Sequence, residues 1–353
     1  MSMCLSTAQL IHPGEEWTNV ERSLRAHGVR LHAPASASWG STEPHSEHWL
    51  LVLPGNGYEP RAALGLKVDA SRALPGHLLV RADRVSFPDD PSAFAVAADA
   101  LAMVARTHGR ILRVTAELTA LGPEALDAAG AAFRAAGFES APMRKWARTL
   151  TVDLRPQESE ILAGFSQQPR RDLRAIEKLP VKVREITDSR WVPRMEALLH
   201  MTYARTGGHV QPGDWPARIA LAHNVPTLTR LIGLFRTDRD DDASLVAFTW
   251  AIFHGDHATY EIGASQRQDD IRVPLLTPLL WDLIRWARST GATWFDLGGV
   301  SVGSTGSADP LEGISDFKRR LSKHEIDVGA QWVLEPHPLR ARLARTIRSL
   351  SGH

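Results

Sequence analysis

The sequence predicts an α/β (α+β) protein of two similar halves, each with a mixed, mostly antiparallel sheet flanked by helices. A chain of 353 residues is long enough for two domains that each bury a core. The order of β-type and helical segments in the first half recurs in the second. In addition, Ala105–Gly109 (ARTHG) and Ala287–Gly291 (ARSTG) end two long helices about half a chain apart, each ahead of a strand. Because helices often end in glycine, the inference of a duplication depends on the shared order as well.

Apolar runs separated by turn residues predict the elements of the first half. A helix with Trp17, Val20 and Leu24 at helical spacing precedes three short apolar runs, which are typical of an antiparallel meander. Two alanine-rich helices follow with a strand between them, and a β-rich run closes the half. The expected segments are helix 14–27, strands 49–53, 62–68 and 77–82, helix 91–109, strand 111–116, helix 123–136 and strand 146–154.

The second half shows the same alternation. Four helical segments and one strand precede a second three-strand meander, and a long helix that begins at Pro274 leads into a short strand. The expected segments are helices 161–165, 170–178, 191–205 and 212–224, strands 181–186, 229–236, 245–253, 258–263 and 294–297, and an alternating run over 326–334. We therefore predict a first domain over 1–147, a second over 148–335 and a C-terminal basic helix over 336–353.

Composition and charge exclude several classes of protein. Hydrophobic residues make up 43% of the chain, which is typical of a folded globular protein. The 41 basic and 40 acidic residues give no global positive field, so a nucleic-acid site must come from local clusters. The single cysteine, Cys4, excludes a disulfide framework and a cysteine-based zinc site, and it favours a reducing cytoplasm. No apolar stretch reaches the roughly 20 residues that span a bilayer, so we expect a cytoplasmic protein without integral membrane association.

The stretch with the strongest candidates for a functional site begins at the strand Trp294–Leu297. The pair Gly298-Gly299 and a loop of small residues follow it, and then a helix carries Phe317, Lys318, Arg319 and Arg320. A strand, an open loop and a cationic helix in this order place fixed positive charge and free backbone N–H groups together, which suits a phosphate or a developing oxyanion.

Spacing alone leaves two interpretations for each of these residues. Lys318 either points into a cleft, with Phe317 packing nearby and Arg319 adding positive field, or belongs to a solvated basic face. Asp296 is either a general base or the cap of a neighbouring turn. Gly298 and Gly299 either allow the backbone to approach a ligand closely or form a plain turn.

Other charged groups are equally ambiguous. Arg170, Arg171 and Arg174 fall within one helical turn and either grip a diphosphate or form ion pairs on an exposed helix. The arginine-rich C-terminal helix either touches RNA or anionic lipid or docks its apolar stripe, which leaves peripheral membrane contact open. The histidine pairs lack a third ligand at metal spacing, so we expect no metal.

The sequence ahead of the long second-half helix argues against acyl-CoA. Acetyltransferases of the GNAT type bind the CoA pyrophosphate on a Gln/Arg-x-x-Gly-x-Gly/Ala turn at this place, because backbone N–H groups at a helix N-terminus attract phosphate. Here Gln266–Pro274 contains no glycine and two acids, and Phe87–Pro91 in the first half is no better. Neither half is therefore expected to bind an acyl-CoA.

Two groups of segments resemble the Fem-type (FemABX-like) aminoacyltransferases, which depend on aminoacyl-tRNA and have twin GNAT-like domains. The first is Phe295–Val300 (FDLGGV) followed by Gly313–Arg319 (GISDFKR), with Gly329 and Trp332 beyond. The second resembles the family's entry into its second domain, and it consists of Thr149–Leu154, Arg170–Lys178 and Val181–Ile186. The resemblance spans about residues 45–335 and is most specific in the second half.

The resemblance implies two tandem GNAT-like domains and an amide-forming transfer. The free amine of an acceptor attacks the ester carbonyl of an aminoacyl-tRNA, which is a co-substrate, so no cofactor is expected. The acceptor is implied to be a peptidoglycan precursor or a small-molecule or peptide intermediate of natural-product biosynthesis. On this reading Lys318 stabilises charge near the tRNA acceptor end and Phe317 shapes the same pocket. Arg170, Arg171 or Arg174 holds acceptor phosphates, Asp296, Gly298, Gly299 and Arg319 complete the substrate site, and no protein base is required.

Two departures from the family pattern affect the acceptor and the tRNA. Trp17, Glu21, Arg22 and Arg25 stand where family members often carry a Trp-to-Lys pattern for the nucleotide-linked acceptor, and no long heptad segment supplies a helical arm. Two other functions compete with the tRNA-dependent one. They are a GNAT-type N-acyltransferase that uses acyl-CoA and a non-catalytic module that binds RNA or a protein partner.

Overall fold

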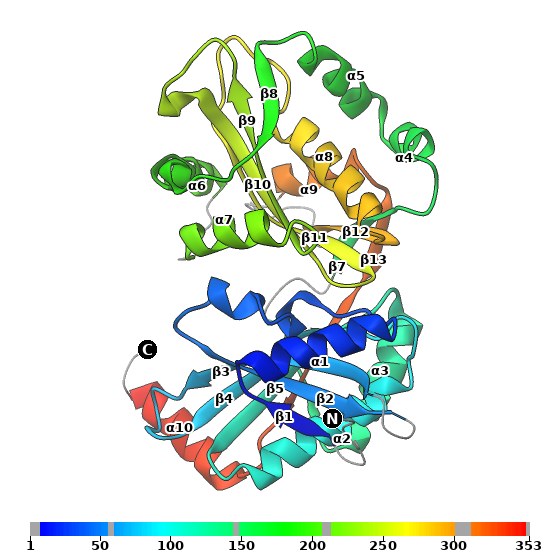
Figure 1. Cartoon of the computed structure of the whole chain (residues 1–353), viewed down its shortest axis with the longest axis vertical. Coiled ribbons are helices and arrows are strands. Elements are labelled where there is room, and N and C mark those ends of the chain that lie inside the picture. The colour runs from blue at the N-terminus through cyan, green and yellow to red at the C-terminus, as the bar shows by residue number, and fades with distance from the viewer. Residues whose placement is uncertain (1–7, 56–59, 144–147, 207–212, 301–311, 351–353) are drawn as a thin grey trace. The chain divides into compact units, whose positions relative to one another are not determined.

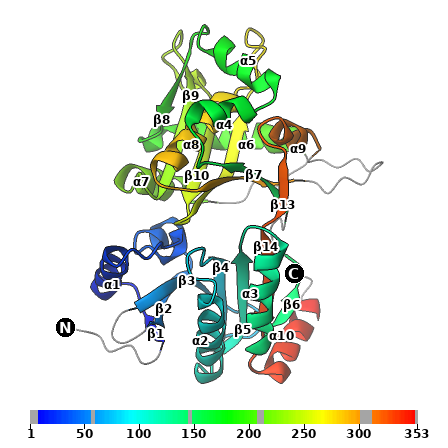
Figure 2. The same ribbon diagram turned by 90° about the vertical axis from the view of Figure 1, so that its right-hand side faces the viewer.

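The computed structural model describes residues 8–55, 60–143, 148–206, 213–300 and 312–350. It divides into two compact units, one formed by residues 1–147 with 327–353 and the other by residues 148–326 (Figure 1). Each unit contains one seven-stranded sheet with helices packed against it (Figure 2).

The sheet of the first unit has the strand order β1-β2-β3-β4-β5-β14-β6. Its neighbours are antiparallel except β4 and β5, which are parallel. The elements are β1 (Gln9–Ile11), α1 (Glu15–Ala26), η1 (Ala33–Ala35), η2 (Trp39–Thr42), β2 (Glu47–Pro54), β3 (Pro60–Ala70), β4 (Leu78–Val85), α2 (Ala93–Thr107), β5 (Ile111–Thr119), α3 (Pro123–Ala135), β6 (Glu139–Ala141), β14 (Gly329–Leu334) and α10 (Pro338–Leu350).

Strand β2 is buried on both faces because helices cover both sides of this sheet. Leu51 and its same-face neighbours pack against α2 and α3, where Leu101 and Phe133 are fully buried. Leu50 and Val52 point the other way and pack against α1. Successive side chains of a strand alternate between faces, so a continuous apolar run such as 49–53 fits a strand between two helical layers.

The sheet of the second unit has the order β8-β9-β10-β11-β12-β7-β13. Its elements are β7 (Arg148–Asp153), α4 (Glu158–Gly164), α5 (Gln167–Ile176), β8 (Val181–Glu185), η3 (Ser189–Trp191), α6 (Val192–Thr206), α7 (Trp215–Asn224), β9 (Thr229–Arg236), η4 (Asp242–Ser244), β10 (Leu245–Phe253), β11 (His257–Ser265), α8 (Leu276–Ser289), β12 (Trp294–Gly299), α9 (Glu312–Arg319) and β13 (His324–Asp327).

The two sheets share the arrangement of five of their seven strands. In each, the first five strands in sheet order are consecutive along the chain, and the fourth and fifth, β4 with β5 and β11 with β12, form the parallel pair. The helices α2 and α8 connect these parallel pairs, and they are the helices that end in the two similar glycine sequences. The predicted fold class of two similar units with mixed sheets is confirmed.

The element order and the predicted domain boundary disagreed about the run 146–154. It was expected to close the first half, but it is β7 in the second sheet beside β12, on the second-domain side of the predicted boundary between residues 147 and 148. The alternating run 326–334 breaks at Val328 into β13, in the second sheet, and β14, which pairs with β5 and β6 in the first. Residues 329–335, expected in the second domain, therefore belong to the first unit, as does the C-terminal helix. Alternation predicts a strand but not the sheet that it joins.

Candidate functional site

The parallel strands β11 and β12 pair over only three residues each, from His257 to Thr259 and from Trp294 to Asp296. Beyond this point β11 continues to Ser265 beside β10, while β12 continues to Gly299 beside β7. Ligands of open α/β sheets bind where neighbouring strands part in this way. A cavity of about 790 Å³ lies beside the part of β11 that no longer pairs with β12.

Every described residue that lines this cavity belongs to the second unit. The lining residues come from α6, β11, the segment 266–275, α8 and α9, and we call this space the Lys318 cavity. They are Thr202, Arg205, Tyr260, Gly263, Ser265, Arg267, Gln268, Ile271, Arg272, Val273, Pro274, Leu275, Leu276, Leu280, Gly313, Ile314, Phe317 and Lys318. The lining includes four cationic side chains and no carboxylate among the described residues, so the cavity favours an anionic ligand.

Lys318 is a buried member of this lining. Its side chain is on α9 and the residue is only 6% exposed. Its Nζ atom donates to the carbonyl oxygen of Gly299 over 2.9 Å and lies 5.7 Å from the centre of the Tyr260 ring. Burial lowers the pKa of the Lys318 ammonium from 10.5 to about 8, while Asp296 acts in the opposite direction. The structure therefore places Lys318 in the cavity wall and not on a solvated basic face.

Asp296 caps the turn that follows it. The residue is buried, and its Oδ1 atom accepts a hydrogen bond from the N–H of Gly298 over 2.7 Å and another from the hydroxyl of Thr149. It does not line the Lys318 cavity. Of the two interpretations, the geometry matches a turn cap, with a carboxylate that also raises the pKa of Lys318.

Gly298 leaves space for the Lys318 side chain. Its φ of +78° lies in the left-handed region that favours glycine. A Cβ atom there would lie 3.2 Å from Nζ of Lys318 and 3.4 Å from the carbonyl oxygen of Tyr260. The diglycine bend thus brings the backbone close to the lysine, while the loop that follows, 301–311, lies outside the described residues.

A buried arginine that sequence reasoning missed anchors the segment 266–274 at the cavity. Arg236, at the end of β9, is 5% exposed and donates through its Nη atoms to both carboxylate oxygens of Asp270, over 2.8 and 2.6 Å. It also binds Asp238, whose pKa this contact lowers to about 2. One of the two acids that made this segment unfavourable for phosphate is therefore neutralised by an ion pair.

The remaining predicted site residues do not all join Lys318. Phe317 lines the same cavity. Arg319 does not, because it turns towards Asp316 and Glu325, at 3.3 and 3.6 Å. Arg170 and Arg174 line a second cavity of about 660 Å³ that shares no lining residue with the first. Arg171 is exposed and lines neither.

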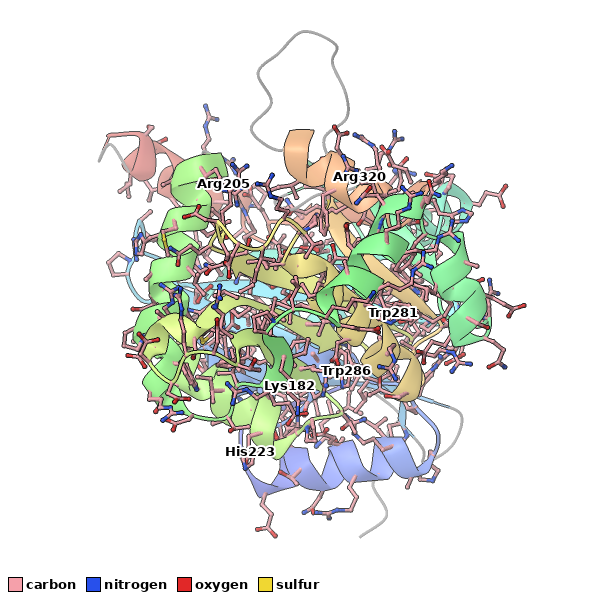
Figure 3. All side chains as sticks on the ribbon, turned by 90° about the horizontal axis from the view of Figure 1, so that it is seen from above. Lys182, Arg205, His223, Trp281, Trp286 and Arg320 are labelled. Carbon is pink, nitrogen blue, oxygen red and sulfur yellow. The ribbon has the colours of Figure 1, made fainter. Side chains whose placement is uncertain are left out.

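The cavity residues that the sequence did not single out are Tyr260, Arg205, Arg267 and Arg272. Arg205 comes from α6, as Figure 3 shows. The other three come from β11 and the segment after it. No spacing in the sequence connects α6 with α9, so the pattern gave no signal for this grouping. The segment 266–274 was considered only for its missing glycines, and its two arginines were a signal that could have been used.

His257 has partners that give it a structural role. His257 is fully buried, stacks on Trp294 at 4.2 Å and lies 2.7 Å from Oδ1 of Asp256. Burial alone would raise the pKa of Asp256, but its contacts with His257 and Trp294 together outweigh burial and lower it. Across the described ranges, no group of three or more His, Cys, Asp or Glu side chains has metal-binding geometry. Among the same residues, no helix has the length and apolar character needed to cross a bilayer.

Comparison with known proteins defines the class of the fold. The family model for the acetyltransferase (GNAT) domain matches residues 163–319. The chain thus has the fold of two tandem GNAT-like units, and the second unit contains the segment that matches the acetyltransferase (GNAT) domain model. No curated protein sequence matches the chain significantly.

Solved structures extend the likeness to both units. The crystal structure of FemX matches 95% of this chain and 100% of its own, with a TM-score of 0.70 at 13% identity. L-PGS from Bacillus licheniformis matches 97% of this chain and 98% of its own, with a TM-score of 0.53 at 14% identity. The chain thus has the fold of FemX over almost its whole length, which is the fold that the Fem-type sequence resemblance predicts.

Proposed function

We propose that this protein is an aminoacyltransferase that moves an amino acid from aminoacyl-tRNA to an amine acceptor. The observation that carries the proposal is the buried Lys318 in the wall of a cationic cavity, on a chain with the fold of FemX. The acceptor is a peptidoglycan precursor or a small-molecule or peptide intermediate, as the Fem-type resemblance implies.

The geometry supports the following chemistry. The acceptor amine forms a C–N bond to the ester carbonyl, the bond from that carbon to the ribose oxygen breaks, and the amine proton passes to the departing oxygen or to water. The carbonyl oxygen carries negative charge in the transition state, and the buried Lys318 ammonium would neutralise it. The carbonyl oxygen of Gly299 accepts a hydrogen bond from Lys318, and the carboxylate of Asp296 favours its charged form. In this proposal the two residues position the lysine.

The cavity lining suits the end of an RNA chain. Arg205, Arg267 and Arg272 bring positive charge to a space where backbone phosphates would enter, and Phe317 offers an apolar ring on which a base can stack. Aminoacyl-tRNA is the co-substrate in this proposal, and no bound cofactor takes part.

One observation favours a second candidate function, a GNAT-type N-acyltransferase that uses acyl-CoA. The first residues of α8 line the Lys318 cavity, and residues 163–319 match the acetyltransferase domain. A helix N-terminus attracts phosphate, although Pro274 supplies no N–H group and the segment has no glycine.

A transfer assay separates the two candidates. The protein is incubated with a pool of charged tRNAs carrying radiolabelled amino acids and with candidate amine acceptors, and new amides are identified by mass spectrometry. We expect transfer that disappears when the RNA is digested beforehand. Transfer from acetyl-CoA, with thermal stabilisation by CoA and no response to charged tRNA, would instead establish the second candidate.

A further inference from the structure

The C-terminal helix α10 packs on the first unit through its smallest side chains. It lies beside β5 (Figure 2), and its residues Ala341 and Ala344 are buried. Leu339 and Leu343 are turned to the solvent, at 84% and 52% exposure. A helix that only covered the sheet would be expected to bury its leucines, because they remove more apolar surface from water than alanines do. The structure thus excludes one interpretation of this helix, that it docks its leucines on the protein.

The exposed leucines belong to one stripe along the helix. Leu339, Leu343 and Ile347 follow one another at intervals of four residues, and Ile347 is half-buried. Side chains four residues apart lie on the same side of a helix, so the three form an apolar stripe about 12 Å long at a rise of about 1.5 Å per residue. We call these three residues the α10 stripe.

Arginines lie along both edges of the α10 stripe. At about 3.6 residues per turn, Arg340 and Arg342 fall on opposite sides of the line that joins the two leucines. Both arginines are exposed. Arg340 donates to the carbonyl oxygen of Gly109 over 2.9 Å, and Arg342 has no ion pair among the described residues. Neither charge is therefore neutralised by a carboxylate in the described part of the chain.

Acidic residues are absent from this end of the sequence. Residues 336–353 contain four arginines and no Asp or Glu. Glu335, which precedes them, is bound by Arg113 and Arg345 over 2.6 and 2.5 Å. The exposed side of α10 is therefore apolar along its middle and cationic along its edges.

An anionic lipid bilayer is complementary to this surface. Leucines of a helix that lies in the plane of a membrane enter the acyl boundary, while arginines extend their apolar stems and place their guanidinium groups at the lipid phosphates. RNA would neutralise the arginines and leave the leucines in water. A second copy of the chain, with α10 packed on α10, would cover the leucines but bring like charges together.

We propose that α10 docks this protein on an anionic phospholipid bilayer, with the helix axis in the plane of the surface. Leu339 and Leu343 would insert, and Arg340 and Arg342 would contact lipid phosphates. An attachment of this size is weak and reversible. The proposal concerns where the protein acts, and it stands independently of the transfer reaction in the Lys318 cavity.

Co-sedimentation of the full chain with lipid vesicles tests this surface. Vesicles of equimolar phosphatidylcholine and phosphatidylglycerol are compared with vesicles of phosphatidylcholine alone, at low salt and without tRNA or acceptor. We expect the protein to bind the anionic vesicles about ten-fold or more tightly, and added salt to weaken this binding. Equal binding to both kinds of vesicle, or no binding at millimolar lipid, would overturn the proposal.

Leucine variants locate the attachment. Leu339→Ser with Leu343→Ser should weaken binding to the anionic vesicles by about ten-fold or more, because it removes the inserted apolar groups and leaves every charge in place. Leu121→Ser is the matched control, since it removes a leucine of the first unit that is 48% exposed and lies outside α10, and it should leave binding unchanged. An equal loss from Leu121→Ser would refute the assigned location.

Arginine variants test the charge at the same place. Arg342→Gln should weaken binding to the anionic vesicles by about five-fold, whereas Arg22→Gln, which removes an exposed arginine of α1, should not. All the replaced side chains are exposed, and circular dichroism verifies that each variant is folded. Equal losses from Arg342→Gln and Arg22→Gln would show that the net charge of the chain and not α10 binds the vesicles.

Two other outcomes would identify a different partner and refute the proposal. One is binding of labelled RNA that Arg342→Gln weakens, with no binding to vesicles. The other is a dimer in sedimentation velocity that the two serine substitutions dissociate, again with no binding to vesicles.

Discussion

Replacing Lys318 with methionine should stabilise the protein while removing its activity. Methionine keeps the length and most of the volume of the side chain and removes its charge. Burial lowers the pKa of Lys318 from 10.5 to about 8, so the charged form is less favourable in the folded chain than in the unfolded one. Below pH 8 the free energy of folding includes the full cost of burying this charge.

The expected size follows from this shift and one hydrogen bond. The depressed pKa corresponds to about 3 kcal/mol of lost folding free energy at pH 7. Lys318→Met would also lose the bond to the carbonyl oxygen of Gly299, which contributes about 1 kcal/mol. The variant should therefore be about 2 kcal/mol more stable than the wild type at pH 7. Between pH 8 and 10.5 the unfolded wild type holds more protons than the folded one, so wild-type stability rises and the difference should vanish near pH 10.

Urea unfolding of both proteins, followed by tryptophan fluorescence at pH 7 and pH 10, measures this difference. Lys323→Met, which removes an exposed lysine near the end of the same helix, is the matched control and should change neither stability nor activity appreciably. In the transfer assay Lys318→Met should lose about 100-fold or more of the rate. A variant that transfers at the wild-type rate, or one that is less stable at pH 7 with no dependence on pH, would refute the reasoning.

Three further predictions concern pH and two glycines. The transfer rate should fall as pH rises through about 8, because the Lys318 ammonium loses its charge, and a rate that keeps rising to pH 10 would contradict the role of that charge. Gly298→Ala should lower both the rate and the free energy of unfolding, the latter by about 1–2 kcal/mol, because its backbone is left-handed, whereas Gly164→Ala, which lies outside the cavity and has no atom within 4 Å of the new Cβ, should be well tolerated in urea unfolding and assay. Gly65→Ala should destabilise the first unit by about 3 kcal/mol or more, since its Cβ would lie 1.9 Å from the carbonyl oxygen of Pro34, and an unchanged urea midpoint would contradict that packing.

Most helices and strands could be predicted from local sequence patterns. The meanders, the alanine-rich helices and their glycine ends each have a period or a stop signal within a few residues, so their type could be predicted from sequence. The sheet that a strand joins could not be predicted from alternation, because β14 follows the second unit in the sequence but joins the sheet of the first. The short strands β1 and β6 have too few residues to show a period, and they were missed.

The candidate site was predictable only in part, for a similar reason. Phe317 and Lys318 could be singled out because the segment that carries them resembles the Fem-type family, whereas spacing alone left Lys318 between a cleft and a solvated face. The ion pair of Arg236 with Asp270 joins residues 34 apart, and no local pattern reports it. Three arginines within one turn of α5 predicted an anion site, but the direction of that helix depends on its packing, which separated Arg170 and Arg174 from Lys318.

The position of β14 has a consequence for how the chain is made. The first unit lacks an internal strand of its sheet until residues 329–334 have left the ribosome, because β14 lies between β5 and β6. The second unit is continuous from 148 to 326 and contains all of its helices before that moment. The part of the protein that is translated first is therefore completed last, and a chain that stops before Gly329 leaves β5 and β6 without the strand that joins them.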